Sequence, residues 1–245
     1  MPYRPRFTSE GQDRVLQKSL DVLQSGSVAV IDLDGVLFDT RARQVRIIQM
    51  FAKQRQDALL AQIQKVHFYD WSLSKTLMNL GLDQEKANRR SKELRPFWER
   101  HFFAPEAVLW DDALPGAAEW VAQVQSAGAT VVYLTGRTEA IRVQTIDALQ
   151  SNSFPWEGCH LFMKPNAAIV DHEFKEEALE RISALGPVAL GIDNEPIQIN
   201  HLAHRFPDAF PIWMCTDHSP RPVTVRKDMA RIHGFLRTKK ALSEG

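Results

Sequence analysis

Short apolar runs alternate with amphipathic stretches along most of this chain, and each apolar run ends in polar or charged residues. The apolar runs occupy residues 27–33, 130–134, 159–163, 187–192 and 210–215. The stretches with helical spacing occupy residues 115–127, 138–151, 174–185 and 195–205. Strands that alternate with helices of this length are typical of βαβ units. The pattern therefore predicts an α/β protein with a parallel sheet flanked by helices.

The two ends of the chain carry weaker patterns. Residues 8–24 have the spacing of an amphipathic helix, with Thr8 or Ser9 available as its N-cap. Residues 221–245 are rich in basic residues and predict a terminal helix. Neither end carries a residue pattern that indicates chemistry.

A long helical segment separates the first predicted strand from the second. Residues 41–107 are too many for a plain crossover connection. One helix face would hold Val45, Ile48, Phe51/Ala52, Leu59/Leu60, Ile63 and Val66, and a second helical stretch covers residues 83–102. We therefore expect a small helical domain at 41–107, inserted into a core made of residues 1–40 and 108–245.

The composition is that of an ordinary globular chain. Of the 245 residues, 44% are hydrophobic and 24% are charged, and the mean hydropathy is −0.28. Thirty Lys and Arg balance thirty Asp and Glu, so no global charge favours nucleic acid. No run approaches the ~18 apolar residues of a membrane helix, and neither a signal-peptide core nor a disulfide framework is visible. We expect a cytoplasmic protein without a membrane partner.

Charge is distributed unevenly between the insertion and the rest of the chain. Residues 41–107 contain 13 basic and 7 acidic residues, a net charge of +6, so the remainder carries −6. A basic lid over an acidic core would attract an anionic substrate, although solvated helix faces also explain most of these residues. Two aromatic and polar clusters in the insertion are candidates for specificity or for packing: residues 67–71, and Arg95, Trp98 and His101.

The first apolar run delivers two carboxylates to the edge where α/β sheets bind ligands. Asp32 and Asp34 follow it on the same side of the chain, because side chains alternate along a strand. Gly35 then lets the backbone turn away. Carboxylates this close need a cation or a shared proton. They could hold Mg²⁺, or one could act as a nucleophile while the other moves a proton; the alternative is a pair of turn aspartates.

Polar residues also follow three of the other apolar runs. Thr135 and Gly136 follow the second run, Lys164 the third and Asp193 the fourth. Because the carboxyl ends of parallel strands meet at one edge of the sheet, these groups would surround a phosphate and a metal ion. Phosphoryl transfer depends mainly on such positioning and charge stabilisation.

Four motifs occur in the order found in the haloacid dehalogenase (HAD) superfamily of phosphohydrolases, which this chain resembles. They are Asp32–Val36, Leu134–Arg137, a lysine at position 164 or 175, and Gly191–Glu195. The resemblance covers residues 27–39 and 108–217 and implies a Rossmann-like core. An insertion after the first strand resembles the C1 cap of this family, which closes over small substrates.

The resemblance implies a role for each matched residue. Asp32 would attack phosphorus and form an aspartyl-phosphate, and Asp34 would protonate the leaving group and then activate water. Thr135 would bind a phosphate oxygen together with Gly136. Asp193 would bind Mg²⁺ with the carboxylate of Asp32 and the main-chain carbonyl of Asp34. Dehalogenase members lack an aspartate at the position of Asp34, so this chain resembles a phosphatase-type member.

Two details of the resemblance stay open. One lysine would neutralise the nucleophile and bind phosphate, and it is either Lys175 or Lys164. We prefer Lys175, because its distance along the chain from Asp193 is similar to that in polynucleotide phosphatases. Asn194 or Glu195 could hold a metal-bound water, or Glu195 could simply favour the start of the next helix. Arg137 could face the phosphate or pair with core acids.

The implied function is an Mg²⁺-dependent phosphatase that acts on a small phosphorylated substrate. One alternative is a nucleotide or nucleic-acid end phosphatase, favoured by the basic insertion and weakened by the neutral overall charge. Others are a phosphotransferase and a non-catalytic protein that binds a phosphorylated ligand. The intact set of Asp32, Asp34 and Asp193 argues against the last. Residues 216–220 follow the fifth predicted strand and would lie at the rim of the site.

Overall fold

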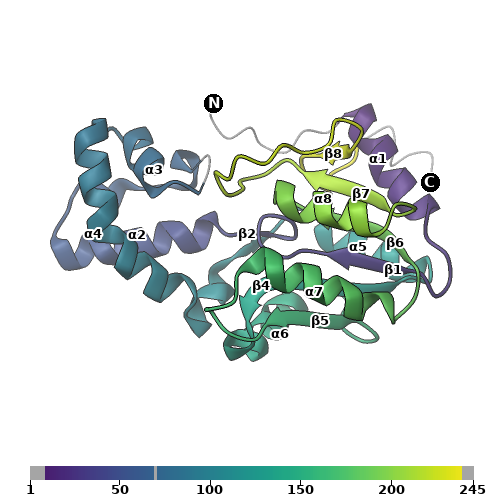
Figure 1. The fold of residues 1–245 in the computed structure, drawn as a ribbon. Coiled ribbons are helices and arrows are strands. Elements are labelled where there is room, and N and C mark those ends of the chain that lie inside the picture. The colour runs from purple at the N-terminus through teal and green to yellow at the C-terminus, as the bar shows by residue number, and fades with distance from the viewer. Residues whose placement is uncertain (1–8, 69–70, 239–245) are drawn as a thin grey trace.

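A six-stranded parallel sheet forms the centre of the molecule (Figure 1). The computed structural model describes residues 9–68 and 71–238. The strands are β1 (Val28–Ile31), β4 (Thr130–Thr138), β5 (His160–Lys164), β6 (Val188–Asp193), β7 (Phe210–Met214) and β8 (Ala230–Ile232). Their order is β5-β4-β1-β6-β7-β8, and each neighbouring pair is parallel. Because β1 lies between β4 and β6, the strands that carry three of the motifs end side by side.

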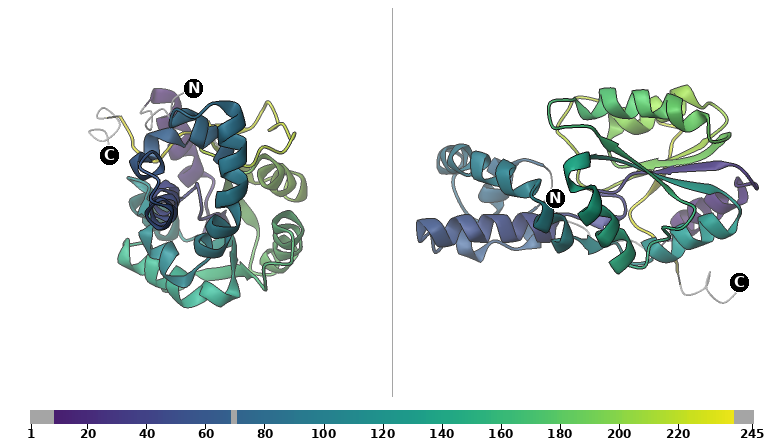
Figure 2. Two further views of the ribbon diagram at one scale, coloured as in Figure 1. Left: turned by 90° about the vertical axis from the view of Figure 1, so that its left-hand side faces the viewer. Right: turned by 90° about the horizontal axis from the view of Figure 1, so that it is seen from below.

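Helices cover both faces of the sheet (Figure 2, right). One face carries α1 (Glu10–Asp21), α5 (Ala117–Ser126) and α6 (Arg142–Ser151), which follows the 3-10 turn η4 (Glu139–Ile141); the other carries α7 (Asp171–Ser183) and α8 (Pro196–Arg205). Ala29 and Ile31 of β1 pack toward the first group, and Val28 and Val30 toward the second. A strand buried on both faces has a continuous apolar run, which is why the sequence predicts it. Across the described residues, no helix combines the length and apolarity that crossing a membrane requires.

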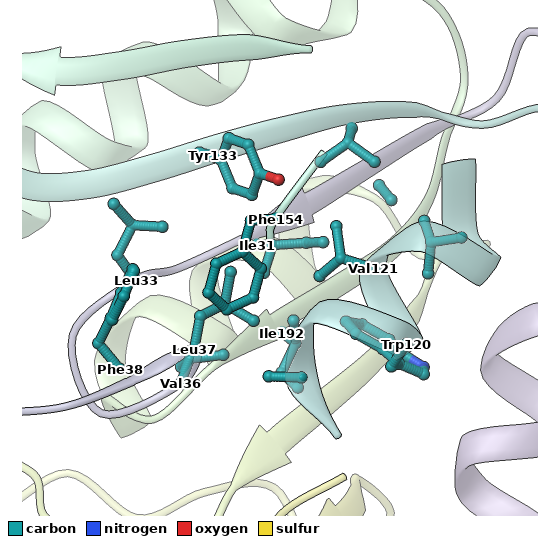
Figure 3. Close-up of a cluster of buried hydrophobic side chains, with 14 of the residues drawn as sticks. Ile31, Leu33, Val36, Leu37, Phe38, Trp120, Val121, Tyr133, Phe154 and Ile192 are labelled. Atoms are coloured by element: carbon teal, nitrogen blue, oxygen red, sulfur yellow. The ribbon is translucent and has the colours of Figure 1, made fainter. Parts of the chain in front are cut away.

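The larger apolar cluster fixes the position of β1 (Figure 3). Ile31 of β1, Tyr133 of β4 and Ile192 of β6 belong to one buried cluster with Trp120 and Val121 of α5. These side chains are at most 3% exposed. Burial of each large apolar side chain contributes roughly 1.5–3 kcal/mol. The carboxyl end of β1 is therefore held by a rigid core.

The insertion is a group of helices beyond the carboxyl edge of the sheet (Figures 1 and 2). It contains α2 (Arg41–Arg55), α3 (Leu73–Asn79) and α4 (Gln84–Phe102), with the 3-10 turns η1 (Leu60–Gln62), η2 (Lys65–His67) and η3 (Pro105–Trp110). These helices bury an apolar cluster of their own. A two-stranded antiparallel ribbon, β2 (Phe38–Asp39) and β3 (Asp112–Ala113), joins the insertion to the core. Both ends of the insertion thus meet at one place.

The first helix of the insertion ends earlier than its apolar pattern predicts. α2 ends at Arg55 because Gln56 takes a left-handed conformation with φ of 52°, and two 3-10 turns follow. Leu60 and Ile63 are still buried, but Val66 is 51% exposed. The prediction of one helix face that runs to Val66 is therefore wrong, because buried side chains in turns imitate helical spacing.

The two ends of the chain give opposite outcomes. At the N-terminus, Ser9 caps α1 and its Oγ accepts a hydrogen bond from the N–H of Gln12 at 3.1 Å; Thr8 lies outside the described residues. The predicted terminal helix is wrong within residues 221–238, where the chain forms loops and the short strand β8. Pairing of β8 with β7 outweighs the local preference of this segment, which also contains Pro222.

Candidate active site

The carboxyl edge of β1 borders a cavity of about 200 Å³ between the core and the insertion. Asp32 and Asp34 both line it, as their spacing predicts. Gly35 turns the chain away with φ of 80°, and a Cβ there would lie 2.3 Å from the side-chain nitrogen of Asn194. The remaining lining residues are Trp71, Phe102, Phe103, Thr135, Gly136, Arg137, Asp171, Lys175, Asn194, Glu195, Gln198, Ser219 and Arg221.

A buried lysine joins two of the predicted acids. Nζ of Lys175, on α7, lies 2.7 Å from Oδ1 of Asp32 and 2.7 Å from Oδ2 of Asp193. The three side chains are 7–9% exposed. Burial raises the pKa of Asp32 to about 8; the charge of Lys175 opposes this rise and that of Asp193 adds to it. The two carboxyl groups of Asp32 and Asp193 therefore share the single positive charge of Lys175, which cannot offset two negative charges.

Asp34 is surrounded by arginines instead. Arg137 donates to it through Nε, at 3.1 and 3.2 Å, and through Nη2, at 2.5 Å. Nη2 of Arg43 lies 3.2 Å away. Burial favours the neutral carboxyl, but the charges of Arg137 and Arg43 outweigh it and lower the pKa of Asp34 to about 2. Asp34 is thus an ionised hydrogen-bond acceptor in this arrangement.

Asp111, which directly precedes β3, ties the two arginines together. Its carboxylate accepts from Nε of Arg43 at 2.9 Å and from Nη2 of Arg137 at 2.9 Å. The side chains of Asp111 and Arg43 are fully buried. Sequence reasoning missed both residues, because ion pairs between positions 68 residues apart leave no spacing pattern. Of the two orientations predicted for Arg137, the structure shows pairing with acids.

Thr135 and Gly136 lie near the end of β4, at the cavity. Thr135 is 1% exposed, and its Oγ1 accepts from the N–H of Arg137 at 3.2 Å. A Cβ at Gly136 would lie 2.7 Å from a carboxylate oxygen of Asp171, so a larger residue there would displace the Asp171 side chain. Close packing therefore explains the glycine of this motif.

The structure separates the two candidate lysines. Lys164, at the end of β5, pairs with Asp171 and is not among the described residues that line the cavity. Lys175 lies in the cavity wall and contacts Asp32 directly. Lys175 lies on α7, which begins at Asp171, three residues earlier than predicted.

Asn194 and Glu195 anchor the rim of the cavity. The side-chain amide of Asn194 donates to the carbonyl of Asp217 at 2.5 Å. Glu195 accepts from the N–H and from the hydroxyl of Ser219, both at 2.6 Å. Pro196 takes the first position of α8, where its missing N–H leaves no hydrogen bond unmade. The structure thus gives both residues a role in holding the loop at 216–220, and Ser219 of that loop lines the cavity.

The two aromatic and polar clusters of the insertion differ in their contact with the cavity. Trp71 lines it, whereas Trp98 packs in the apolar cluster of the insertion at 8% exposure. His101 stacks on Phe97 and Arg95 pairs with Glu99, both within α4. Neither His101 nor Arg95 is among the described residues that line the cavity. Two further members of the first cluster lie outside the described residues: Tyr69 and Asp70.

The oxygen donors beside β1 and β6 fit a hard cation. Oδ2 of Asp32 has no hydrogen-bond partner among the described residues, and Oδ1 of Asp193 accepts from the N–H of Glu195 at 2.8 Å. Residues 9–68 and 71–238 contain no group of three or more His, Cys, Asp or Glu arranged for a metal. The protein therefore offers two carboxylates. Mg²⁺ commonly binds through one or two carboxylates and completes its shell with water and substrate phosphate.

Comparison with known proteins identifies the fold. Neither a protein-family model nor a curated protein sequence matches the chain. Protein Tyrosine Kinase A of Mycobacterium tuberculosis aligns with 91% of this chain over 98% of its own, at 14% identity and a TM-score of 0.54. A predicted phosphoglycolate phosphatase from Haemophilus somnus aligns with 85% over 94% of its own, at 11% identity and a TM-score of 0.50. A haloacid dehalogenase-like hydrolase from Streptococcus pneumoniae aligns with 89% over 98%, at 13% and 0.49.

At such low sequence identities, structural similarity shows a shared fold but not a shared function. The first two structures match this chain along most of its length. The chain therefore shares with them an α/β core that carries a helical insertion, the fold class that its apolar pattern predicts.

Proposed function

We propose that this protein is an Mg²⁺-dependent phosphatase that acts on a small phosphorylated substrate through an aspartyl-phosphate. The observation that carries the proposal is the contact of Lys175 with both Asp32 and Asp193, at a cavity that Asp32 and Lys175 line. A carboxylate beside a fixed ammonium is suited to attack phosphate, because the ammonium offsets the repulsion between two anions. The fold shared with a predicted phosphatase supports the same function.

In the proposed reaction, an oxygen of Asp32 attacks phosphorus and the bond between phosphorus and the leaving-group oxygen breaks. Thr135 and the N–H of Gly136 bind the phosphate oxygens, and Lys175 offsets their charge. Water then attacks the aspartyl-phosphate, which releases inorganic phosphate and restores the carboxylate of Asp32. Positioning and charge stabilisation thus supply most of the catalysis.

Asp34 moves the protons in this proposal. It accepts a proton from the attacking water in the second step, a role that suits a carboxylate ionised by Arg137 and Arg43. Donation of a proton to the leaving group in the first step requires these guanidinium contacts to loosen. Since Arg43 belongs to the insertion, movement of the insertion would change the proton affinity of Asp34.

The carboxylates of Asp32 and Asp193, with the main-chain carbonyl of Asp34, would hold Mg²⁺. The bound ion supplies further charge stabilisation to the phosphoryl group. Asn194 and Glu195 would contribute only through water, because their side chains already anchor the rim.

We further propose that residues 41–107 act as a C1-type cap on a core formed by residues 1–40 and 108–245. The cavity of about 200 Å³ is smaller than the ~300–1,000 Å³ of sites for drug-sized ligands, which supports a small substrate. The net charge of +6 on the insertion favours approach of an anion. Closure of the cap would exclude water from the reaction.

A phosphotransferase is the second candidate, because a protein with this fold is named as a kinase. The same residues would then pass the phosphoryl group to an alcohol instead of water. Addition of glycerol as a competing acceptor separates the two functions. A phosphotransferase forms glycerol phosphate, and a phosphatase releases only inorganic phosphate.

Hydrolysis of 4-nitrophenyl phosphate tests the proposal. We expect turnover with Mg²⁺, none with EDTA, and a loss of roughly a thousandfold or more in Asp32→Asn, which removes the nucleophile. Asp208→Asn, a change at an exposed acid in a turn, serves as the matched control and should keep full activity. Turnover that persists in Asp32→Asn, or that is unchanged when EDTA is added, would contradict the proposal.

A further inference from the structure

The walls of the cavity differ in chemistry. The core contributes the carboxylates and Lys175, whereas the insertion contributes three aromatic side chains, Trp71, Phe102 and Phe103. Phe103 is 47% exposed, although it is large and apolar. An apolar side chain exposed in a cavity that also holds charged groups indicates a ligand with an apolar part that covers it.

The aromatic wall is rigid. Phe102 is 1% exposed and stacks on Trp98, with ring centroids 4.3 Å apart and 21° between the ring planes. Trp71 and Phe103 each contact Phe102 edge-on, with ring centroids 5.7 Å apart for Trp71 and 5.1 Å apart for Phe103. The guanidinium of Arg43 lies 4.2 Å from the same ring. A wall held on several sides loses little entropy when a ligand packs against it.

One cation that lines the cavity has no acidic partner among residues 9–68 and 71–238. Lys175 and Arg137 are both paired with carboxylates, whereas Arg221 is exposed and forms no ion pair within the described residues. Two further acids that line the cavity are engaged elsewhere: Glu195 accepts from Ser219 and Asp171 pairs with Lys164. Arg221 is therefore available to bind an anionic group of a ligand.

We propose that the substrate is a phosphomonoester whose leaving group contains a single aromatic ring, and that this ring bears a second anionic group. The ring packs against Trp71 and Phe103, and the anion pairs with Arg221. The cavity of about 200 Å³ admits one ring beside the phosphate rather than a larger group. This inference rests on the proposed phosphatase function and adds the substrate class to it.

Two matched phosphomonoesters test the aromatic part. Benzyl phosphate and cyclohexylmethyl phosphate have the same carbon number and alcohol leaving groups of similar basicity, so they differ mainly in the ring. We expect kcat/KM to be about two- to tenfold higher for benzyl phosphate, the range of an aromatic contact. The preference should fall toward one in Phe103→Leu and stay in Leu109→Ala, an exposed apolar residue that does not line the cavity.

The anionic part is tested with 4-carboxybenzyl phosphate. Wild-type protein should prefer it to benzyl phosphate by about two- to fivefold, the range of an exposed ion pair. Arg221→Gln should abolish this preference. Arg226→Gln, an exposed arginine of the same loop, should keep it.

The wild-type substrate pairs decide the outcome even if a variant folds poorly. Equal kcat/KM for benzyl and cyclohexylmethyl phosphate would overturn the aromatic subsite and leave the phosphatase function standing. So would hydrolysis of ethyl phosphate without hydrolysis of either ring compound. Failure to hydrolyse any phosphomonoester, 4-nitrophenyl phosphate included, would overturn the proposed function itself.

Discussion

Asp32 and Asp34 stand two residues apart, yet different regions of the molecule hold them. The partners of Asp32 are Lys175 and Asp193, which belong to the core. Asp34 is held by Arg137 of the core and by Arg43 of the insertion. Its pKa is lowered to about 2, whereas that of Asp32 is raised to about 8. The pKa values of two carboxyl groups close together in sequence can therefore shift in opposite directions, because one contacts a single ammonium group and the other contacts two guanidinium groups.

Removal of Asp111 should cause the largest effect on the Asp34 side. Asp111→Ala leaves Arg43 and Arg137 buried with one carboxylate fewer, and we expect the free energy of unfolding to fall by about 3–5 kcal/mol. Urea unfolding measures it. Asp112→Ala, a change at the next residue, whose side chain is 57% exposed, should cost less than about 1 kcal/mol. Similar losses in the two variants would refute the difference between buried and exposed acids.

Removal of Lys175 is the corresponding change on the Asp32 side. Lys175→Met takes away the charge that offsets Asp32 and the phosphate, so kcat should fall by about 100- to 1,000-fold. Lys164→Met is the matched control and should stay within about twofold of wild type, because Lys164 contacts Asp171 away from the nucleophile. The reverse result would assign the motif lysine to Lys164.

Lowering the pH tests the charge on Asp34, with a smaller effect. Its folded pKa of about 2 lies below the ~3.9 of an unfolded aspartate, so its ionisation stabilises the fold above that value. This stabilisation is lost as the pH falls toward 2. Between pH 5 and 2, urea titrations of wild type should show a decline roughly 2–3 kcal/mol larger than those of Asp34→Asn. Parallel declines would count against the arginine pairs.

The sheet could be predicted because its strands are buried on both faces. β1, β5, β6 and β7 lie within about one to two residues of their apolar runs, and residues of all four motifs line the cavity at the predicted edge. The short β2, β3 and β8 carry no such signal, since their pairing depends on partners distant in sequence. Local pattern alone therefore predicted a helix where β8 forms.

The same limit applies to the site. Asp32, Thr135 and Asp193 could be found because each lies at or directly after the end of an apolar run. The pairing of Arg137 with Asp34 joins residues 103 positions apart, and Arg43 is one of 13 basic residues in the insertion. Only the packing of the insertion on the core distinguishes Arg43 from the rest. Tertiary contacts, rather than spacing, select such partners.

The β2–β3 ribbon brings the two ends of the insertion side by side. Because the two strands pair in register, the ends of the insertion stand at neighbouring positions, where a two-residue turn can connect them. Asp32, Lys175 and Asp193 all lie on the chain that would remain. A different segment between the same two strands could therefore change the cavity wall that faces the acids of the core, provided that it again supplies a cation for Asp34 and Asp111 in place of Arg43.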